Sequence, residues 1–326
     1  MTNVVFISPD FPQINITLVE RASRAGLRML GLGDADYDGL DVRLKESLTE
    51  YYRVPTLDSY DEVLRGVAFL TFKYGKIDVL ESNNAYWLSQ DGRLREDFNI
   101  GHGPTSRASD SESLEMLRDA GLEVGAPEGE ILSYEALVGE DGEPLAEAAT
   151  AWPAESAYDY TYRTLAEVPE ELRALGRRAT GVLDAELTFV HIQVAFPDGA
   201  APRIIRASRS AAPAFTWDMH DHARQMDIYE TWAHMLAGLD ENLTPHEPGM
   251  SQPATPVQIC IYASRQDGVA YAKDSLEIEA TWSDQLRFVG RNPEQYRAGM
   301  GDSYYLAVVD TNEEADRFAA DVMTRS

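Results

Sequence analysis

Short apolar runs alternate with segments of helical apolar spacing along the first hundred residues. Three runs, at residues 4–8, 27–32 and 77–81, have the length and composition of buried strands. The segments 14–25 and 58–74 repeat apolar side chains at helical spacing, which predicts helices with one buried face. Because strands that alternate with helices usually form βαβ units, we expect a mostly parallel sheet covered by helices.

From residue 101 onward the pattern changes to longer strands joined by turns. Alternating side chains on both sides of the turns at residues 139–142 and 197–199 predict two hairpins. The expected strands lie at residues 131–138, 144–149, 187–194, 203–207, 257–263, 276–280 and 304–309, and the expected helices at 111–120, 169–183, 227–239 and from 313 onward. The sequence therefore predicts an α/β chain, with a Rossmann-like unit over residues 1–100 and an α+β unit over residues 101–326.

The chain is strongly acidic, with 28 basic residues, 55 acidic residues and a formal net charge of −27. Such a surface repels nucleic acid and anionic membranes, so we expect neither as a partner. It suits a cationic partner, but an acidic solvated surface that binds nothing is the favoured interpretation.

The cellular location is expected to be cytoplasmic. The single cysteine, Cys260, excludes an intramolecular disulfide and is typical of a reducing compartment. Its apolar neighbours, residues 257–262, favour a buried strand residue over a nucleophile. No stretch is long and apolar enough to span a membrane, and the N-terminus lacks the features of a signal peptide.

The densest polar cluster of the sequence lies at residues 218–222 (DMHDH). If a helix begins near Thr216, Asp218 and His222 lie one turn apart on the same face. Histidine and carboxylate together can bind a transition metal or act as acid and base, so Asp218, His220 and His222 are candidate catalytic residues. The alternative is a solvated helix start, where the helix dipole favours acidic side chains.

A second polar group follows the expected strand at residues 77–81. Glu81, Asn83 and Asn84 come where this strand ends. Ligands of parallel α/β sheets bind at the carboxyl ends of strands, so these three residues are candidate ligand-binding residues. The sequence has no dinucleotide-binding fingerprint, Ser-His-Asp spacing or cysteine-based zinc motif.

Several phrases of the sequence are specific enough to carry a family resemblance. They are residues 6–12 (FISPDFP), 30–34 (LGLGD), 51–54 (YYRV), 73–78 (KYGKID), 81–88 (ESNNAYWL), 94–100 (LREDFNI), 167–172 (EVPEEL), 189–191 (FVH), 218–219 (DM) and 300–306 (MGDSYYL). In this order they resemble bacterial ATP-grasp ligases of the carboxylate–amine type over nearly the whole chain. The resemblance implies a pre-ATP-grasp domain at residues 1–100, an ATP-grasp-like domain at residues 101–326, and a homodimer.

The lobe that binds ATP in that family has no counterpart in this sequence. Residues 121–125 (GLEVG) resemble the phrase before the lobe and residues 129–138 (GEILSYEALV) the phrase after it, with almost nothing between them. In the family this lobe supplies lysines to the phosphates, whereas no lysine occurs here from residue 77 to residue 272. Because polyphosphate needs cationic neighbours, the sequence predicts a truncated domain that does not bind ATP.

The metal ligands of the family are replaced as well. The resemblance implies magnesium ligands on the strand after the Phe-x-His phrase and in a later Glu-x-Asn pair. The matching positions hold Gln193, Arg206 and Ser208. Magnesium prefers carboxylate oxygens, and the guanidinium of Arg206 would repel it and replace it as a fixed cation for a ligand. We therefore expect no metal and no cofactor.

The resemblance also implies that residues 158–163 lie near the acceptor pocket of the ligases. Tyrosines and an arginine suit the recognition of a carboxylate or amino-acid ligand, so Tyr160 and Arg163 are candidate ligand-binding residues. The alternative is that these side chains pack in a core or an interface.

The sequence as a whole predicts a degenerate ATP-grasp protein that is not an ATP-dependent ligase. It would bind a small carboxylate or amino-acid-like ligand, or a partner protein such as an active ligase. Two alternatives stay open. One is an enzyme with ATP-independent chemistry in the remodelled cleft, and the other is a minimal ATP-grasp ligase that is still active.

Overall fold

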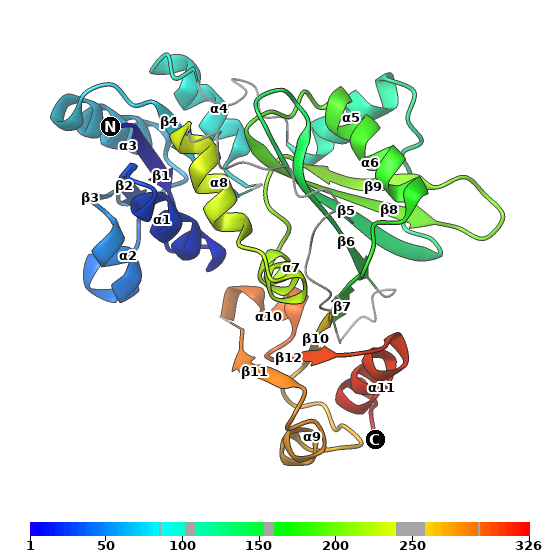
Figure 1. Ribbon diagram of the computed structural model, residues 1–326. Coiled ribbons are helices and arrows are strands. Elements are labelled where there is room, and N and C mark those ends of the chain that lie inside the picture. The colour runs from blue at the N-terminus through cyan, green and yellow to red at the C-terminus, as the bar shows by residue number, and fades with distance from the viewer. Residues whose placement is uncertain (85, 102–108, 153–159, 239–257, 293) are drawn as a thin grey trace.

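The fold is built around two β-sheets (Figure 1). The computed structural model describes residues 1–84, 86–101, 109–152, 160–238, 258–292 and 294–326. One sheet has four strands and is parallel, and the other has eight strands and is antiparallel. This mixed architecture confirms the α/β class expected from the hydrophobic pattern.

The smaller sheet lies within residues 1–100. Its strands are β1 (Asn3–Ile7), β2 (Arg28–Gly33), β3 (Glu50–Arg53) and β4 (Val79–Glu81), in the order β3-β2-β1-β4. Its helical segments are α1 (Ile14–Arg24), η1 (Tyr37–Gly39), α2 (Val42–Ser47), α3 (Tyr60–Tyr74) and α4 (Leu88–Asp97). Alternation along β1 sends Val4 and Phe6 into one core and Val5 and Ile7 into another, so both faces of the sheet are buried.

The larger sheet lies within residues 101–326 and has the order β11-β12-β10-β7-β6-β5-β8-β9. Its strands are β5 (Glu130–Val138), β6 (Pro144–Trp152), β7 (Thr161–Thr164), β8 (Thr188–Phe196), β9 (Arg203–Ser208), β10 (Ile259–Arg265), β11 (Leu286–Arg291) and β12 (Ser303–Val309). The helices are α5 (Asp110–Asp119), α6 (Glu170–Val182), α7 (Thr216–Arg224), α8 (Ile228–Ala237), α9 (Ser275–Thr281), α10 (Glu294–Met300) and α11 (Asn312–Met323). Among the described residues, no helix combines the length and the apolar character needed to cross a membrane.

One expected strand is wrong, because residues 276–280 belong to helix α9. Asp274 caps this helix: its carboxylate accepts the backbone N–H of Glu277, and the carboxylate of Glu277 accepts the backbone N–H of Asp274, each at 2.8 Å. This reciprocal capping box stabilises a helix start. Leu276 is exposed and Ile278 is buried, so the apparent alternation comes from two faces of a helix.

Cys260 is buried in β10, as its apolar neighbours predict. Burial raises the pKa of its thiol to about 12. The thiolate, which is the nucleophilic form, is therefore scarce at neutral pH.

The two faces of the larger sheet differ in character. One face packs against α6, where Tyr134 and Leu172 share an apolar core. The other face is covered by α7, and we call it the α7 face. Cross-strand pairing places Ser133 and Glu135 of β5 on the α7 face together with His191 of β8.

A row of aromatic rings crosses the α7 face from β6 to β11. Its five members are Trp152, Tyr162, Tyr262, Tyr304 and Phe288. Consecutive ring centroids are 4.7, 4.9, 5.5 and 5.9 Å apart, with interplanar angles of 22°, 19°, 19° and 11°. Each strand contributes one ring, so the row fixes the side-by-side position of β6, β7, β10, β12 and β11.

A single apolar core joins the two sheets. Helix α1, which covers the smaller sheet, lies beside α8, which belongs to the larger part (Figure 1). Trp232 of α8 contacts Phe6 of β1 edge to face, with centroids 6.3 Å apart. Trp217 of α7 lies in the same core and packs against Phe189 of β8.

The connection between α5 and β5 is short and carries no separate lobe. Residues 120–129 make the whole link, and Val124 forms an isolated parallel bridge with Ile204 of β9. Gly129 has φ +77°, and a Cβ added there would lie 2.2 Å from the carbonyl oxygen of Phe196. The link therefore runs tightly along the edge of the sheet before it enters β5.

Substitution Trp232→Ala tests whether the shared core holds both sheets in one cooperative unit. We expect the free energy of unfolding to fall by about 3–5 kcal/mol, because Trp232 is fully packed and the helix cannot close the cavity. Urea unfolding followed by circular dichroism measures this loss. Phe72→Ala, at a side chain that is 90% exposed, is the control and should change the value by less than about 0.5 kcal/mol. An equal effect of both variants would contradict a shared core.

Candidate functional site

Gln193, Arg206 and Ser208, which the resemblance matches to metal-ligand positions, lie together on the α7 face. Gln193 of β8 pairs in register with Arg206 of β9, and His191 pairs with Ser208. Residues paired across antiparallel strands point to the same face, so all four side chains share one surface. The structure thus brings Gln193, Arg206 and Ser208 together on one surface.

An ion pair occupies this part of the face. Arg206 donates from Nε to Oδ2 of Asp110 at 3.0 Å, and Asp110 is the first residue of α5. The hydroxyl of Ser208 lies 2.9 Å from the hydroxyl of Ser210, and both are buried. Within the described ranges, no group of three or more His, Cys, Asp or Glu side chains is arranged to hold a metal ion.

A buried polar pair, Glu135 and His191, lies next to these residues and was not predicted as a site. Nδ1 of His191 is 2.8 Å from Oε2 of Glu135. The hydroxyl of Ser133 donates to the other carboxylate oxygen of Glu135 at 2.5 Å, and the indole N–H of Trp152 donates to Ser133. A carboxylate at Nδ1 orients the imidazole and favours the tautomer with the proton on Nδ1.

Nε2 of His191 is buried and makes no hydrogen bond in the described part of the chain. Buried polar atoms usually have a partner, so a carboxylate-oriented histidine with a free Nε2 is a candidate for ligand binding or catalysis. The only sequence signal for this pair was a run of polar residues on one face of two otherwise apolar strands.

The structure separates the residues of the 218–222 cluster. The predicted helix start is confirmed, since α7 begins at Thr216. His220 is fully buried, its Nε2 lies 3.0 Å from the hydroxyl of Thr150, and burial holds its pKa well below the usual range. His222 is exposed, and Asp218 is partly buried, with a pKa raised by desolvation. His220 is therefore packed inside the protein, whereas His222 lies at its surface.

The turn that follows β4 is held by hydrogen bonds that the side chains of Glu81, Asn83 and Asn84 accept from backbone N–H groups. The carboxylate of Glu81 accepts the backbone N–H groups of Ser82 and Asn83, at 3.1 and 2.8 Å. The side-chain oxygen of Asn83 accepts the N–H of Ala211 at 2.9 Å, and that of Asn84 accepts the N–H of Tyr86 at 3.0 Å. Asn83 thus connects the smaller sheet to the loop after β9.

Tyr160 and Arg163 point to different sides of the larger sheet. Tyr160 packs against Trp152, with ring centroids 5.9 Å apart, on the α7 face. Arg163 forms an ion pair of 2.5 Å with Asp316 of α11, on the opposite face. Residues 158 and 159 of the same phrase, and Ala85 of the earlier one, lie outside the described residues.

The comparison with solved structures places this architecture among known proteins. No family model matches the sequence, and no curated protein matches it. The structure is similar to L-amino acid ligase from Bacillus licheniformis, with a TM-score of 0.71, 14% identity, and coverage of 99% of this chain and 97% of that one.

Two further solved structures are also similar to this chain over nearly its whole length. Phosphoribosylglycinamide synthetase from Anaerococcus prevotii has a TM-score of 0.69 at 10% identity, with coverage of 99% of this chain and 98% of the other. N5-carboxyaminoimidazole synthetase from Staphylococcus aureus has a TM-score of 0.61 at 10% identity, with coverage of 98% and 96%. These neighbours are ATP-grasp carboxylate–amine ligases, and at these identities the likeness shows that the chain has the ATP-grasp fold.

Asp221 provides a pH test of the α7–α8 region. Burial, with smaller effects of Asp227 and Asp218, raises its pKa to about 8, although its carboxylate accepts the N–H of Ile228 at 3.0 Å. An unfolded aspartate titrates near about 3.9. Between these pH values the folded chain keeps a proton that the unfolded chain has lost, so the free energy of unfolding falls as pH rises.

Asp221→Asn cannot ionise and keeps a hydrogen-bond acceptor. The compared quantity is the free energy of unfolding of Asp221→Asn minus that of the unsubstituted protein. We expect this difference to increase by roughly 1–3 kcal/mol between about pH 4 and about pH 8. Urea unfolding across this range measures the difference. Asp198→Asn, at an exposed turn, controls for the loss of one negative charge. A difference for Asp221→Asn that is constant with pH would contradict the raised pKa.

Proposed function

We propose that this protein is not an ATP-dependent ligase and that it binds a small carboxylate- or amino-acid-like ligand on the α7 face. The observation that carries the proposal is the ion pair between Arg206 and Asp110, beside Gln193. By resemblance these β8 and β9 positions would hold magnesium in an active ligase. A guanidinium there repels a divalent cation and leaves no carboxylate on either strand to bind it.

The path of the chain gives further support. Residues 120–129 link α5 directly to β5, where the resembling ligases carry the lobe that holds the phosphates. The stretch from residue 77 to residue 272 has no lysine, and phosphoryl transfer depends on cations that neutralise the phosphates. Both features remove the groups that would stabilise a bound nucleotide.

The side chains that remain suit a small anionic or zwitterionic ligand. Arg206 keeps 43% of its side chain exposed despite its ion pair, so part of its guanidinium can donate to a carboxylate. Gln193, directly opposite in the register, offers both a donor and an acceptor. Nε2 of His191 adds a third polar group on the same face.

Calorimetric titration of the full chain with ATP and Mg²⁺ tests the first half of the proposal. We expect no saturable heat at millimolar nucleotide, because the phosphates would meet neither lysine nor metal. The L-amino acid ligase from Bacillus licheniformis, titrated in the same buffer, is the positive control. Stoichiometric, magnesium-dependent binding to this protein would overturn the proposal and favour a minimal active ligase.

A second function, ATP-independent acid–base catalysis, is favoured by the pair of Glu135 and His191. A buried carboxylate that fixes Nδ1 leaves Nε2 able to accept a proton from a substrate. The same histidine would bind a ligand without reaction if no substrate bond is labile. The tautomer of His191 distinguishes the alternatives. An unprotonated Nε2 is available as a base, whereas a protonated Nε2 can only donate a hydrogen bond.

Long-range ¹H–¹⁵N spectra of the labelled protein report this tautomer. We expect a protonated Nδ1 and an unprotonated Nε2 for His191, with the signal assigned by its loss in His191→Gln. The exposed His222 provides an internal reference for an imidazole that exchanges between tautomers. Two protonated nitrogens on His191, or the opposite tautomer, would rule out the base.

A further inference from the structure

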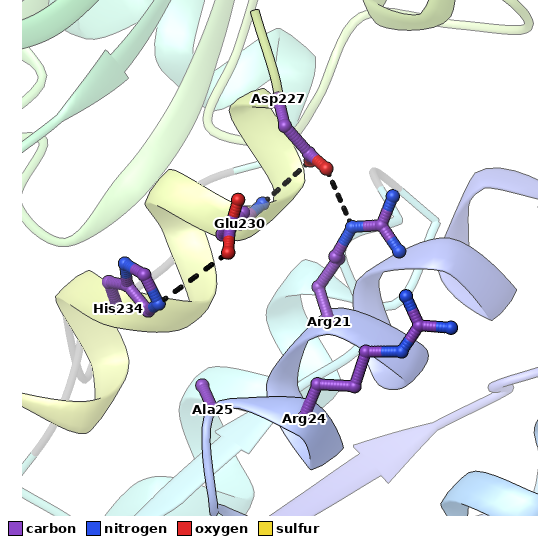
Figure 2. Close-up of a pocket in the computed structure, with 6 residues that line it drawn as sticks. All are labelled: Arg21, Arg24, Ala25, Asp227, Glu230 and His234. Atoms are coloured by element: carbon purple, nitrogen blue, oxygen red, sulfur yellow. Dashed lines mark hydrogen bonds and ion pairs between the residues drawn. The ribbon is translucent and has the colours of Figure 1, made fainter.

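A polar pocket of about 250 Å³ lies between α1 and α8, on elements that do not contribute to the ligand site proposed above. Figure 2 shows its lining: Arg21, Arg24 and Ala25 come from the end of α1, and Asp227, Glu230 and His234 come from the start and middle of α8. Its volume is below the range of about 300–1,000 Å³ that is usual for pockets of drug-sized ligands. Only a smaller molecule fits.

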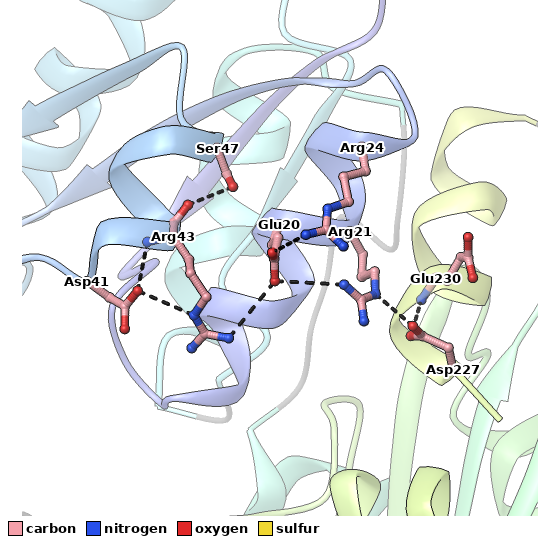
Figure 3. A network of polar contacts seen from close by, with 8 residues as sticks. All are labelled: Glu20, Arg21, Arg24, Asp41, Arg43, Ser47, Asp227 and Glu230. Carbon is pink, nitrogen blue, oxygen red and sulfur yellow. Dashed lines mark hydrogen bonds and ion pairs between the residues drawn. The ribbon is translucent and has the colours of Figure 1, made fainter. Parts of the chain in front are cut away.

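The charges of the pocket are segregated by helix. Both guanidiniums belong to α1 and both carboxylates belong to α8, so one wall is positive and the other is negative. Figure 3 shows how the walls are fixed: ion pairs run from Arg43 of α2 through Glu20 and Arg21 of α1 to Asp227 of α8. The network holds the walls in place before any ligand arrives.

Both carboxylate oxygens of Asp227 already accept hydrogen bonds within the protein. One carboxylate oxygen accepts Nε of Arg21 at 2.7 Å, and the other accepts the backbone N–H of Glu230 at 2.9 Å. Within the described ranges, Arg24 hydrogen-bonds only through Nη2, which donates to Glu20 at 2.6 Å. Among the described residues the carboxylate of Glu230 accepts no hydrogen bond: Nε2 of His234 lies 3.9 Å away, beyond hydrogen-bond distance, and Arg21 interacts with it only electrostatically.

We infer that this pocket binds a small zwitterion, a free α-amino acid. Its carboxylate takes the unused donors of Arg24 and Arg21 on α1, and its ammonium takes the carboxylate of Glu230 on α8. The net charge of −27 supports this choice, because the field of the whole chain opposes a simple anion and does not oppose a molecule without net charge. The inference stands independently of the ligand proposed for the α7 face.

Calorimetric titration of the full chain with glycine and L-alanine tests the pocket, with acetate and methylammonium as the two half-ligands. We expect saturable binding of the amino acids and at least about tenfold weaker binding of each half-ligand, since each makes only one of the two contacts. Arg24→Gln and Glu230→Gln should each weaken amino-acid binding by at least about tenfold. Both side chains are largely exposed, so neither change should unfold the protein.

Arg65→Gln is a matched control for Arg24→Gln. Arg65 is 66% exposed on α3 and pairs with Glu62 at 2.7 Å, while Arg24 is 65% exposed and pairs with Glu20 at 2.6 Å. The control should leave binding unchanged. Absence of saturable binding, equal binding of acetate, or binding that both pocket variants retain would overturn the inference. Binding that only Arg206→Gln removes would place the amino acid on the α7 face, which refutes the pocket and supports the proposed function.

Discussion

The apolar core between α1 and α8 is the constraint on which the rest of the structure depends. The four-stranded sheet needs α1 to bury one of its faces, and α1 in turn needs α8 and the two tryptophans that follow β9. Asn83 adds a directional hydrogen bond across the same junction, to the N–H of Ala211. Because both sheets bury side chains in this one core, neither has a complete hydrophobic surface without the other.

Much of the fold can be predicted from local hydrophobic patterns in the sequence. Apolar runs and helical spacing gave β1, β2, β4, α1 and α3 within a few residues of their observed ends. The error at residues 276–280 has a local cause, since the capping interaction between Asp274 and Glu277 outweighs a short alternation. Strand β11 escaped prediction because residues 287–289 are exposed on both faces, so no buried alternation marks them.

The candidate site was predictable only through a family resemblance. The resemblance matches Gln193, Arg206 and Ser208 to metal-ligand positions, and their proximity follows from a hairpin that the sequence indicates. The partners that matter chemically are distant in sequence: Glu135 is 56 positions from His191, and Asp110 is 96 positions from Arg206. The link between Arg21 and Asp227 spans 206 positions, and no periodicity along the chain can reveal such contacts.

The aromatic row on the α7 face also has an optical consequence. Its rings lie nearly parallel and only 4.7–5.9 Å apart, so their electronic transitions couple and are held in one chiral arrangement. Near-ultraviolet circular dichroism arises from such fixed aromatic packing and vanishes when the packing is lost. The alignment of β6, β7, β10, β12 and β11 therefore contributes to the near-ultraviolet spectrum of the native chain, together with the other packed aromatic side chains. One spectrum distinguishes an assembled larger sheet from a collapsed chain that keeps only its helices.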